Sequence, residues 1–381
     1  MLIPCRRHPE AGAGRWPLFQ PVDDSAALCH HRFCVRPGRF WGRGERRGQT
    51  IAVRALILGS GSSGNCTLVE TSTTRVLVDA GFNRKETLRR LAALGASTDR
   101  VDGICISHEH SDHIAGLSSL AELWRAPVYL TAGTLDEIGR QAALARQGGR
   151  PRPGRGRHGG GTGRTYGTTR TERGKGTEQA HGQEGTDRGS PGTSGATVAE
   201  AAMQEKLPGV ECIQPSQKFA VGDIEVTAFS IPHDAADPVA YSLRAEGSKI
   251  SIVTDLGYLP AHVRRHLCGS DLLVLESNHD LDMLKVGPYP WHIKQRVMSR
   301  TGHLSNHAVS EFLADVDQEG TGFDARARWL VLAHLSENNN NPDVARLSAE
   351  EALARRASGP AAFAGELYVA SQRTPLGPFV F

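Results

Sequence analysis

The chain has 381 residues, of which 39% are hydrophobic, so it can bury one large core or two smaller ones. Its formal net charge of +3 hides a basic excess at residues 1–50 and about 146–196. The rest of the chain carries a net charge of about −8, so the charge does not indicate a basic nucleic-acid surface on the core. No apolar run approaches about 18 residues, which excludes a transmembrane helix.

The cysteines and the N-terminal residues indicate the compartment. The seven cysteines are an odd number and are scattered, and Cys66 and Cys105 lie in apolar segments typical of buried thiols. The first residues lack the continuous apolar stretch of a secretory signal. We therefore expect a cytoplasmic protein without a disulfide framework.

Residues 1–50 are rich in Arg, Gly and Pro and show no sustained period, which predicts a disordered N-terminal extension. The run CHHRFC, from Cys29 to Cys34, contains residue types that bind metals. Its spacing matches no standard zinc site, so we interpret these residues as incidental.

A folded domain is expected over 51–375, with strands and helices that alternate. Early strands joined by short turns favour antiparallel pairing, and the later alternation favours a layered α/β protein with helices outside two sheets. The expected strands are 51–58, 66–71, 74–79, 103–107, 127–130, 223–230, 238–245, 249–254, 271–276 and 328–333. The expected helices lie near 84–95, 115–125, 133–145, 260–268, 290–300, 305–315 and 342–356.

Within this domain, residues 146–200 form a Gly/Arg-rich segment with almost no apolar residue to bury. This composition predicts a disordered insertion. An arginine- and glycine-rich segment can hold single-stranded nucleic acid, but a neutral surface loop is the interpretation we favour. His158 and His181 lie inside it and are poor metal ligands, because a mobile loop does not preorganise a site.

The strongest chemical signal is HEHSDH, directly after the apolar strand GICIS. His108, His110, Asp112 and His113 stand within six residues at a strand end, where they cannot all be buried without compensation. Imidazole and carboxylate together suit Zn²⁺, Mn²⁺ or Fe²⁺. His108 and His110 can serve one metal while Asp112 and His113 face another.

Three later residues supply what a site for two metals still lacks. His233 follows the strand IEVTAFS in a turn, Asp255 ends the strand ISIVT, and His334 ends WLVLA. Each alone is a weak signal. In this order, and each at a strand end, the three predict one shared site.

With Asp79 in VLVDAG, this ligand series resembles that of the metallo-β-lactamase superfamily. The resemblance implies an α/β fold, specifically an αββα four-layer sandwich, that holds two divalent metal ions (Zn or Mn, with Fe as a further candidate). It also implies that Asp79 steadies the HEHSDH loop from behind. The implied ligands are His108, His110 and His233 for the first metal and Asp112, His113 and His334 for the second, with Asp255 bridging.

A narrower resemblance covers nearly all of 54–372 outside the insertion. Strings such as LGSGSSGN, HEHSDHIAGL, LESNHDLDML, GPYPWHIKQRV and LAHLSENNN are similar to the YycJ (WalJ) family. The family implies a 5′-to-3′ exonuclease on DNA. We expect its substrate to be single-stranded DNA and its partners to be DNA-repair proteins. The insertion and the N-terminal extension depart from the family pattern, so both leave substrate access and regulation open.

The mechanism implied is hydrolysis by a metal-bridged hydroxide delivered in line to phosphorus, with Asp112 among the catalytic residues. We expect His303 in GHLSN to act as general acid or phosphate contact, with Glu276 orienting it. Leu275 stands where the related motif of tRNA-maturing nucleases has histidine, so this relay is incomplete. The alternative is that His303 caps the helix that starts near Asn306.

Two segments are candidates for binding substrate. The Gly/Ser loop 60–65 can present backbone N–H groups to a phosphate, although a tight turn explains it equally well. The segment around Trp291 combines aromatic and cationic residues that suit stacking on unpaired bases, although an ordinary amphipathic helix is a serious rival. The predicted substrate-binding residues are Ser62, Ser63, Asn65, Trp291, Lys294, Ser305 and Asn306, with Tyr289 and Arg296 beside Trp291 and Lys294.

Three alternatives to a DNA exonuclease remain open. A small-molecule thioester or lactam hydrolase would share the fold, but IPHDAADP differs from the third motif of thioester-cleaving relatives. A metal-dependent binding or redox-sensing protein would keep the site without cutting. An RNA-processing nuclease would differ only in contacts to the 2′-OH, which the sequence does not locate.

Overall fold

The computed structural model describes residues 53–146, 207–315, 321–356 and 362–381. The expected N-terminal extension, with Cys29–Cys34, lies outside the described residues. So does the expected insertion at 146–200, except for Arg146, the last residue of a helix. No helix of the described part is long and apolar enough to cross a membrane.

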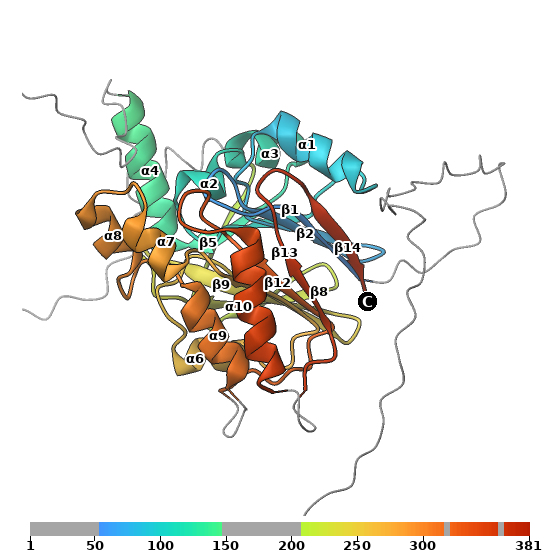
Figure 1. Cartoon of the computed structure of the whole chain (residues 1–381). Coiled ribbons are helices and arrows are strands. Elements are labelled where there is room, and N and C mark those ends of the chain that lie inside the picture. Colours follow the sequence, from blue (N-terminus) through green and yellow to red (C-terminus); the bar gives the residue numbers. More distant parts are fainter. Residues whose placement is uncertain (1–52, 147–206, 316–320, 357–361) are drawn as a thin grey trace, which may run out of the picture. The chain divides into compact units, whose positions relative to one another are not determined.

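Two seven-stranded sheets form the centre of the fold (Figure 1). In each sheet, one half is antiparallel and the other half is parallel. The first sheet has the order β14 (Leu376–Val380), β1 (Arg54–Gly59), β2 (Cys66–Glu70), β3 (Arg75–Val78), β4 (Gly103–Cys105), β5 (Val128–Thr131) and β6 (Val210–Ile213). The second has the order β13 (Glu366–Val369), β12 (Trp329–Ala333), β11 (Leu272–Glu276), β10 (Ser248–Val253), β9 (Val239–Ala245), β8 (Ile224–Ser230) and β7 (Lys218–Val221).

The helices lie on the outer faces of the sheets and in the loops around the site. Several carry clear start signals, such as Asn83, Asp280, Ser305 and Asn341, whose side chains accept hydrogen bonds from the first turn of the helix. The helices are α1 (Arg84–Ala93), α2 (Ser111–Ile114), α3 (Leu117–Trp124), α4 (Ala132–Arg146), α6 (Ala261–Leu267), α7 (Leu281–Val286), α8 (Trp291–Val297), α9 (Asn306–Ala314) and α10 (Pro342–Ala354).

Three apolar cores separate four layers. The central core joins the inner faces of the two sheets, with Val78 of one sheet and Tyr241 of the other among its buried residues. A second core packs β1 to β5 against α1, α3 and α4, and a third packs β8 to β12 against α6, α9 and α10. This arrangement confirms the predicted αββα sandwich.

The expected strands and helices are all present within a few residues of their predicted ends. The short strands β6, β7, β13 and β14 and the short helices α2 and α7 were not predicted. The expected boundary at residue 375 is wrong, because β14 pairs with β1 and is therefore an integral strand of the first sheet.

Strand ends position the site. Asp79, Asp255 and His334 each follow a strand closely and have φ values of 59°, 63° and 53°. L-residues seldom adopt this left-handed conformation, although Asp and His tolerate it better than bulky or β-branched residues. Such constrained backbone is costly and often occurs where side chains must point in a particular direction.

Candidate active site

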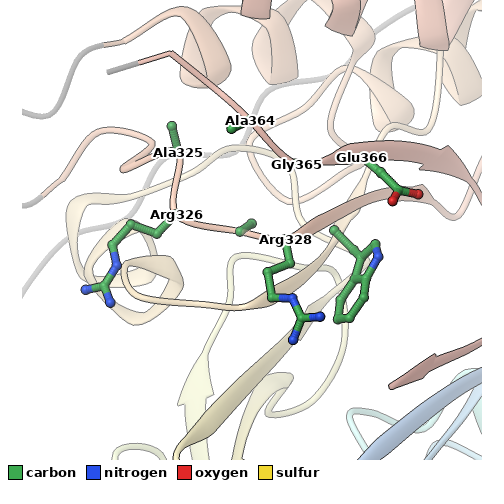
Figure 2. A pocket seen from close by; sticks show the side chains of 8 residues that line it. Ala325, Arg326, Arg328, Ala364, Gly365 and Glu366 are labelled. Atoms are coloured by element: carbon green, nitrogen blue, oxygen red, sulfur yellow. The ribbon is translucent and has the colours of Figure 1, made fainter. Parts of the chain in front are cut away.

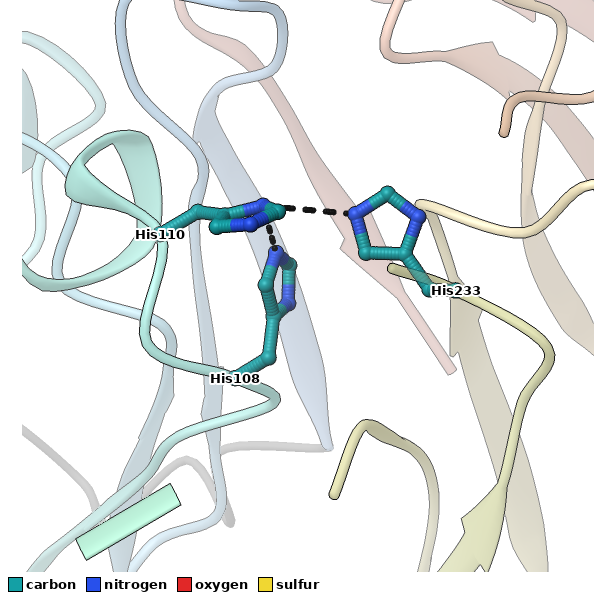
Figure 3. A group of neighbouring side chains, drawn as sticks. All are labelled: His108, His110 and His233. Atoms are coloured by element: carbon teal, nitrogen blue, oxygen red, sulfur yellow. Dashed lines mark hydrogen bonds between the residues drawn. The ribbon is translucent and has the colours of Figure 1, made fainter. Parts of the chain in front are cut away.

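The first candidate ligand group consists of His108, His110 and His233. Nε2 of His108 lies 3.0 Å from Nδ1 of His110, and Nε2 of His233 lies 3.3 Å from that same Nδ1 atom. In Figure 3 the rings of His108 and His233 both point toward the ring of His110. Three imidazole nitrogens that converge in this way are the donor set of a zinc-type cation.

The second candidate ligand group consists of Asp112, His113 and His334. Oδ2 of Asp112 lies 3.5 Å from Nε2 of His113 and 3.4 Å from Nε2 of His334. His113 and His334 are buried, and Asp112 is half-buried. Nitrogen and oxygen donors together again suit a divalent transition metal.

Asp255 lies between the two groups. Its Oδ2 is 3.1 Å from Nε2 of His113, and its Oδ1 is 3.9 Å from Nε2 of His233. Oδ2 is buried, and His113 Nε2 is its near neighbour without forming a well-aligned hydrogen bond to it. Because a buried carboxylate oxygen without a well-aligned donor is costly, a cation at this position would stabilise it.

Four of these histidines are also held through their second ring nitrogen. Such contacts fix the ring orientation and leave the inward nitrogen free to bind a metal. The outer contacts are His108 Nδ1 to Ser107 Oγ (3.0 Å), His113 Nδ1 to Asp79 Oδ2 (2.9 Å), His233 Nδ1 to the Gly302 carbonyl (3.2 Å) and His334 Nδ1 to Glu276 Oε1 (2.8 Å). The residues present therefore fit two divalent cations.

Asp79 contacts the HEHSDH loop from behind, where the resemblance placed it as a supporting residue. Its Oδ1 accepts a hydrogen bond from the Ser107 backbone N–H (2.8 Å), and its Oδ2 accepts one from the Ser107 hydroxyl (3.0 Å). Ser107 was not singled out from the sequence, yet its hydroxyl also lies 3.1 Å from Nδ1 of His113. Its place directly before the histidine motif was the available signal.

Burial and charge act in opposite directions on these groups. Burial alone would lower the pKa of His113, but the carboxylates of Asp79, Asp255 and Asp112 raise it well above its ordinary value. Burial alone would also lower the pKa of His334, but the neighbouring carboxylates, Asp255 first among them, raise it well above its ordinary value. In contrast, burial lowers the pKa of His108 well below its ordinary value.

Glu276 and His303 form a pair beside both ligand groups. Oε1 of Glu276 lies 2.9 Å from Nδ1 of His303, while Oε2 accepts hydrogen bonds from the backbone N–H groups of Leu256 (2.9 Å) and Leu304 (3.1 Å). Burial opposes ionisation of Glu276, but His303 and His334 outweigh it and lower its pKa to about 2.

The His303 ring is at the open side of this pair. Its centroid is 5.2 Å from that of His233 and 5.3 Å from that of His334, and 22% of its side chain is exposed. The alternative that His303 caps a helix is wrong, because the Ser305 hydroxyl caps α9 by accepting from the Ala308 N–H. His303 is thus placed to meet a molecule held between the ligand groups.

The Gly/Ser loop divides into exposed and buried parts. Ser62 and Ser63 are exposed beside the site, and the backbone N–H of Ser63 is used by the side chain of Gln372 (2.8 Å). Asn65 is buried, and its amide lies 3.2 Å from Asp112 Oδ2 and 3.1 Å from His113 Nε2. Asn65 therefore positions two candidate ligands rather than offering its side chain to solvent.

The structure corrects two further expectations. Lys294 does not present its charge to solvent, because its side chain is buried and Nζ donates to the Lys285 carbonyl (2.6 Å). Asn306 is also buried and exchanges amide hydrogen bonds with Asn340 (2.9 Å each way). Helix periodicity does not distinguish a solvent-facing lysine from one that reaches a carbonyl of a neighbouring helix.

Trp291 is accessible to a substrate, because 63% of its surface is exposed at the start of α8. Arg296, at the other end of this helix, pairs with Asp234, the residue after His233. Tyr289 receives a hydrogen bond from Asn338 at 3.2 Å. The α8 segment therefore runs along the rim from the His334 loop to the His233 loop.

A separate hollow of about 320 Å³ lies at the opposite end of the second sheet, around the start of β12 (Figure 2). Figure 2 shows the guanidinium groups of Arg326 and Arg328 pointing away from Ala325 and Ala364. The candidate ligand His334 follows the other end of β12, so this hollow is not part of the site.

Comparisons with known proteins agree with this geometry. Residues 59–211 match the family model of the metallo-beta-lactamase superfamily, and residues 196–334 match that of the beta-lactamase superfamily domain. The metallo-beta-lactamase fold protein YhfI from Bacillus subtilis has a similar fold, with a TM-score of 0.51 at 16% identity over 85% of this chain and 99% of YhfI.

Two curated relatives extend over most of the chain. It is 30% identical over 311 residues to exodeoxyribonuclease YycJ of Bacillus anthracis, covering 80% of this chain and 90% of that protein. It is 27% identical over 305 residues to exodeoxyribonuclease WalJ of Streptococcus pneumoniae, with the same coverage of 80% and 90%. The chain therefore belongs to the YycJ/WalJ family of metallo-β-lactamase-fold hydrolases.

Proposed function

We propose that this protein is a two-metal phosphodiesterase that removes nucleotides from the 5′ end of single-stranded DNA. The observation that carries the proposal is the pair of ligand groups with Asp255 between them and His303 on their open side. When bound, two ions would supply Lewis-acid activation of water and of phosphate oxygens. Zn²⁺ and Mn²⁺ are the preferred candidates for this donor set.

The chain's own residues would orient the reactants. The HEHSDH loop, held by Asp79 and Asn65, fixes the positions of His113 and Asp112. Preorganised groups of this kind contribute to catalysis because they need little rearrangement in the transition state. The names of the YycJ and WalJ relatives support deoxyribonucleic acid as the substrate class.

His303 would deliver a proton to the leaving 3′ oxygen. Glu276 holds its Nδ1 side, so the Nε2 side is free to face the substrate. A general acid must lie within hydrogen-bond reach of the leaving atom, and a partly exposed imidazole between the two ligand groups meets this requirement. A 5′-to-3′ activity would suit the DNA-repair role expected from the family resemblance.

The test uses single-stranded DNA labelled at the 5′ end or at the 3′ end. Protein stripped of metal with a chelator, then supplied with Mn²⁺ or Zn²⁺, should release labelled mononucleotide first from the 5′ end. The Asp112→Ala/His113→Ala double variant should bind less metal and release no label. Cleavage of labelled RNA alone would change the substrate class, and faster turnover of a thioester than of DNA would overturn the phosphodiesterase proposal.

A further inference from the structure

A cavity of about 460 Å³ lies beside the second ligand group. Three loops line it: the segment after His334, the segment between β13 and β14, and Ser60 at the start of the Gly/Ser loop. Cavities of this size hold a small organic molecule, not a length of polymer. None of the chemistry described above uses its side chains.

Ser60 joins the cavity to the candidate metal centre. Its hydroxyl accepts a hydrogen bond from the backbone N–H of His334 (2.9 Å) and donates to Oδ1 of Asn65 (2.9 Å). The Asn65 amide in turn lies 3.2 Å from Asp112. Through Ser60 and Asn65, the wall of the cavity is therefore two hydrogen bonds away from the candidate ligand Asp112.

The lining combines apolar and polar side chains. It includes the buried Leu335 and Ala370 and the side-chain amides of Asn338 and Gln372. Flat apolar faces with hydrogen-bonding edges are the chemistry of a nucleobase, and side-chain amides recognise such edges well. Asn338 also contacts Tyr289, which adds an aromatic ring at the border of the cavity.

A charged side chain of the cavity lining, Arg373, suits the phosphate of a nucleotide. Arg373 is largely exposed, with 84% of its side chain accessible, and lies 3.3 Å from Glu337. A guanidinium in this position can exchange its carboxylate partner for a backbone phosphate. On the basis of these contacts, and resting on the proposed phosphodiesterase function, we propose that the cavity takes one nucleoside unit next to the phosphate that is cut.

The test is to fill the cavity without touching the ligand groups. Asn338→Trp places an indole at its wall, and Leu347→Trp, on the exposed face of α10, is the matched control. We expect Asn338→Trp to raise KM for a single-stranded oligonucleotide at least tenfold. It should leave the hydrolysis of methyl p-nitrophenyl phosphate, which has no nucleoside, within twofold of wild type, and Leu347→Trp should leave both unchanged.

A binding measurement separates this inference from the proposed function. Deoxyadenosine, which has no phosphate, should bind the wild type in a ligand-observed NMR titration and lose that binding in Asn338→Trp. If the wild type cuts no phosphodiester but binds the nucleoside in this way, the proposed function fails and the cavity assignment stands. Equal nucleoside binding by both proteins, or an unchanged oligonucleotide KM in a folded Asn338→Trp protein, would overturn the cavity assignment.

Discussion

Replacement of Glu276 by glutamine should disable the second ligand group while keeping the shape of the side chain. The carboxylate makes four contacts: Oε2 with the backbone N–H groups of Leu256 and Leu304, and Oε1 with Nδ1 of His303 and of His334. A glutamine has only one oxygen. Because backbone N–H groups can only donate, that oxygen must face Leu256 and Leu304, and the new NH₂ must face the two imidazoles.

The imidazoles can accept from this NH₂ only at an unprotonated Nδ1, which moves their proton to Nε2. In His334, Nε2 is the atom 3.4 Å from Asp112, so a proton there removes a metal ligand. If the rings keep their present tautomer, two charge-assisted hydrogen bonds are lost at about 1.5–3 kcal/mol each, or about 3–6 kcal/mol in total. Either outcome should lower metal affinity by about 10–100-fold.

The assay is a competitive titration with a chromophoric chelator, together with urea unfolding of the metal-free protein. Glu109→Gln is the matched control: Glu109 is also buried in the HEHSDH loop, but its side chain contacts no candidate ligand and accepts a 2.8 Å hydrogen bond from the Ala236 N–H. We expect Glu109→Gln to retain wild-type metal affinity. Equal affinities and equal unfolding midpoints for wild type and Glu276→Gln would refute this reasoning.

Three other predictions test separate parts of the structure. Trp291→Ala should weaken binding of single-stranded DNA by about 1–3 kcal/mol in a fluorescence anisotropy titration. Lys294→Ala should leave this binding unchanged, because Lys294 is buried. Equal losses of affinity in the two variants would contradict this distinction. Gly59→Ala should lower the free energy of unfolding in urea by about 1–3 kcal/mol, because the new Cβ would lie 2.3 Å from Nη1 of Arg90; an unchanged midpoint would show that Arg90 moves aside freely. Burial lowers the pKa of Lys249 to about 8, so between about pH 8 and 10.5 the unfolded chain binds more protons and Lys249 should make stability rise with pH. The stability difference between wild type and Lys249→Met should therefore change across this range, and a constant difference would refute the shift.

The sequence was informative wherever a strong period or a dense motif was present. The strands that form the centre of each sheet, such as β11, are continuous apolar runs and were predicted within a residue or two. The strands β6 and β7 are short, lie at sheet edges and expose alternate or successive residues, so they carry no apolar run to detect. β14 contains Pro378, which argues against a strand unless its place at a sheet edge is known.

Some residues of the candidate site could likewise be predicted from the sequence, and others could not. Residues of the HEHSDH motif and those at strand ends could be proposed as ligands because several metal-binding residue types stand where strands end, and the structure brings them together. The contact of Asn65 with Asp112 joins two loops that meet only in the folded chain, so no spacing rule identifies it; Ser107 stands directly before the motif but carries no metal-binding group that would mark it. The same limit explains why Lys294 and Asn306 were assigned to substrate when the fold uses their side chains internally.

The most direct test of the two-metal site is to count metal ions per chain by native mass spectrometry while following release of a 5′ label from single-stranded DNA. We predict two bound ions in the active wild type, and loss of both one ion and the activity in Asp112→Ala, because Asp112 contacts only the second ligand group. Full 5′-label release by a protein that holds one ion or none would contradict the two-metal site.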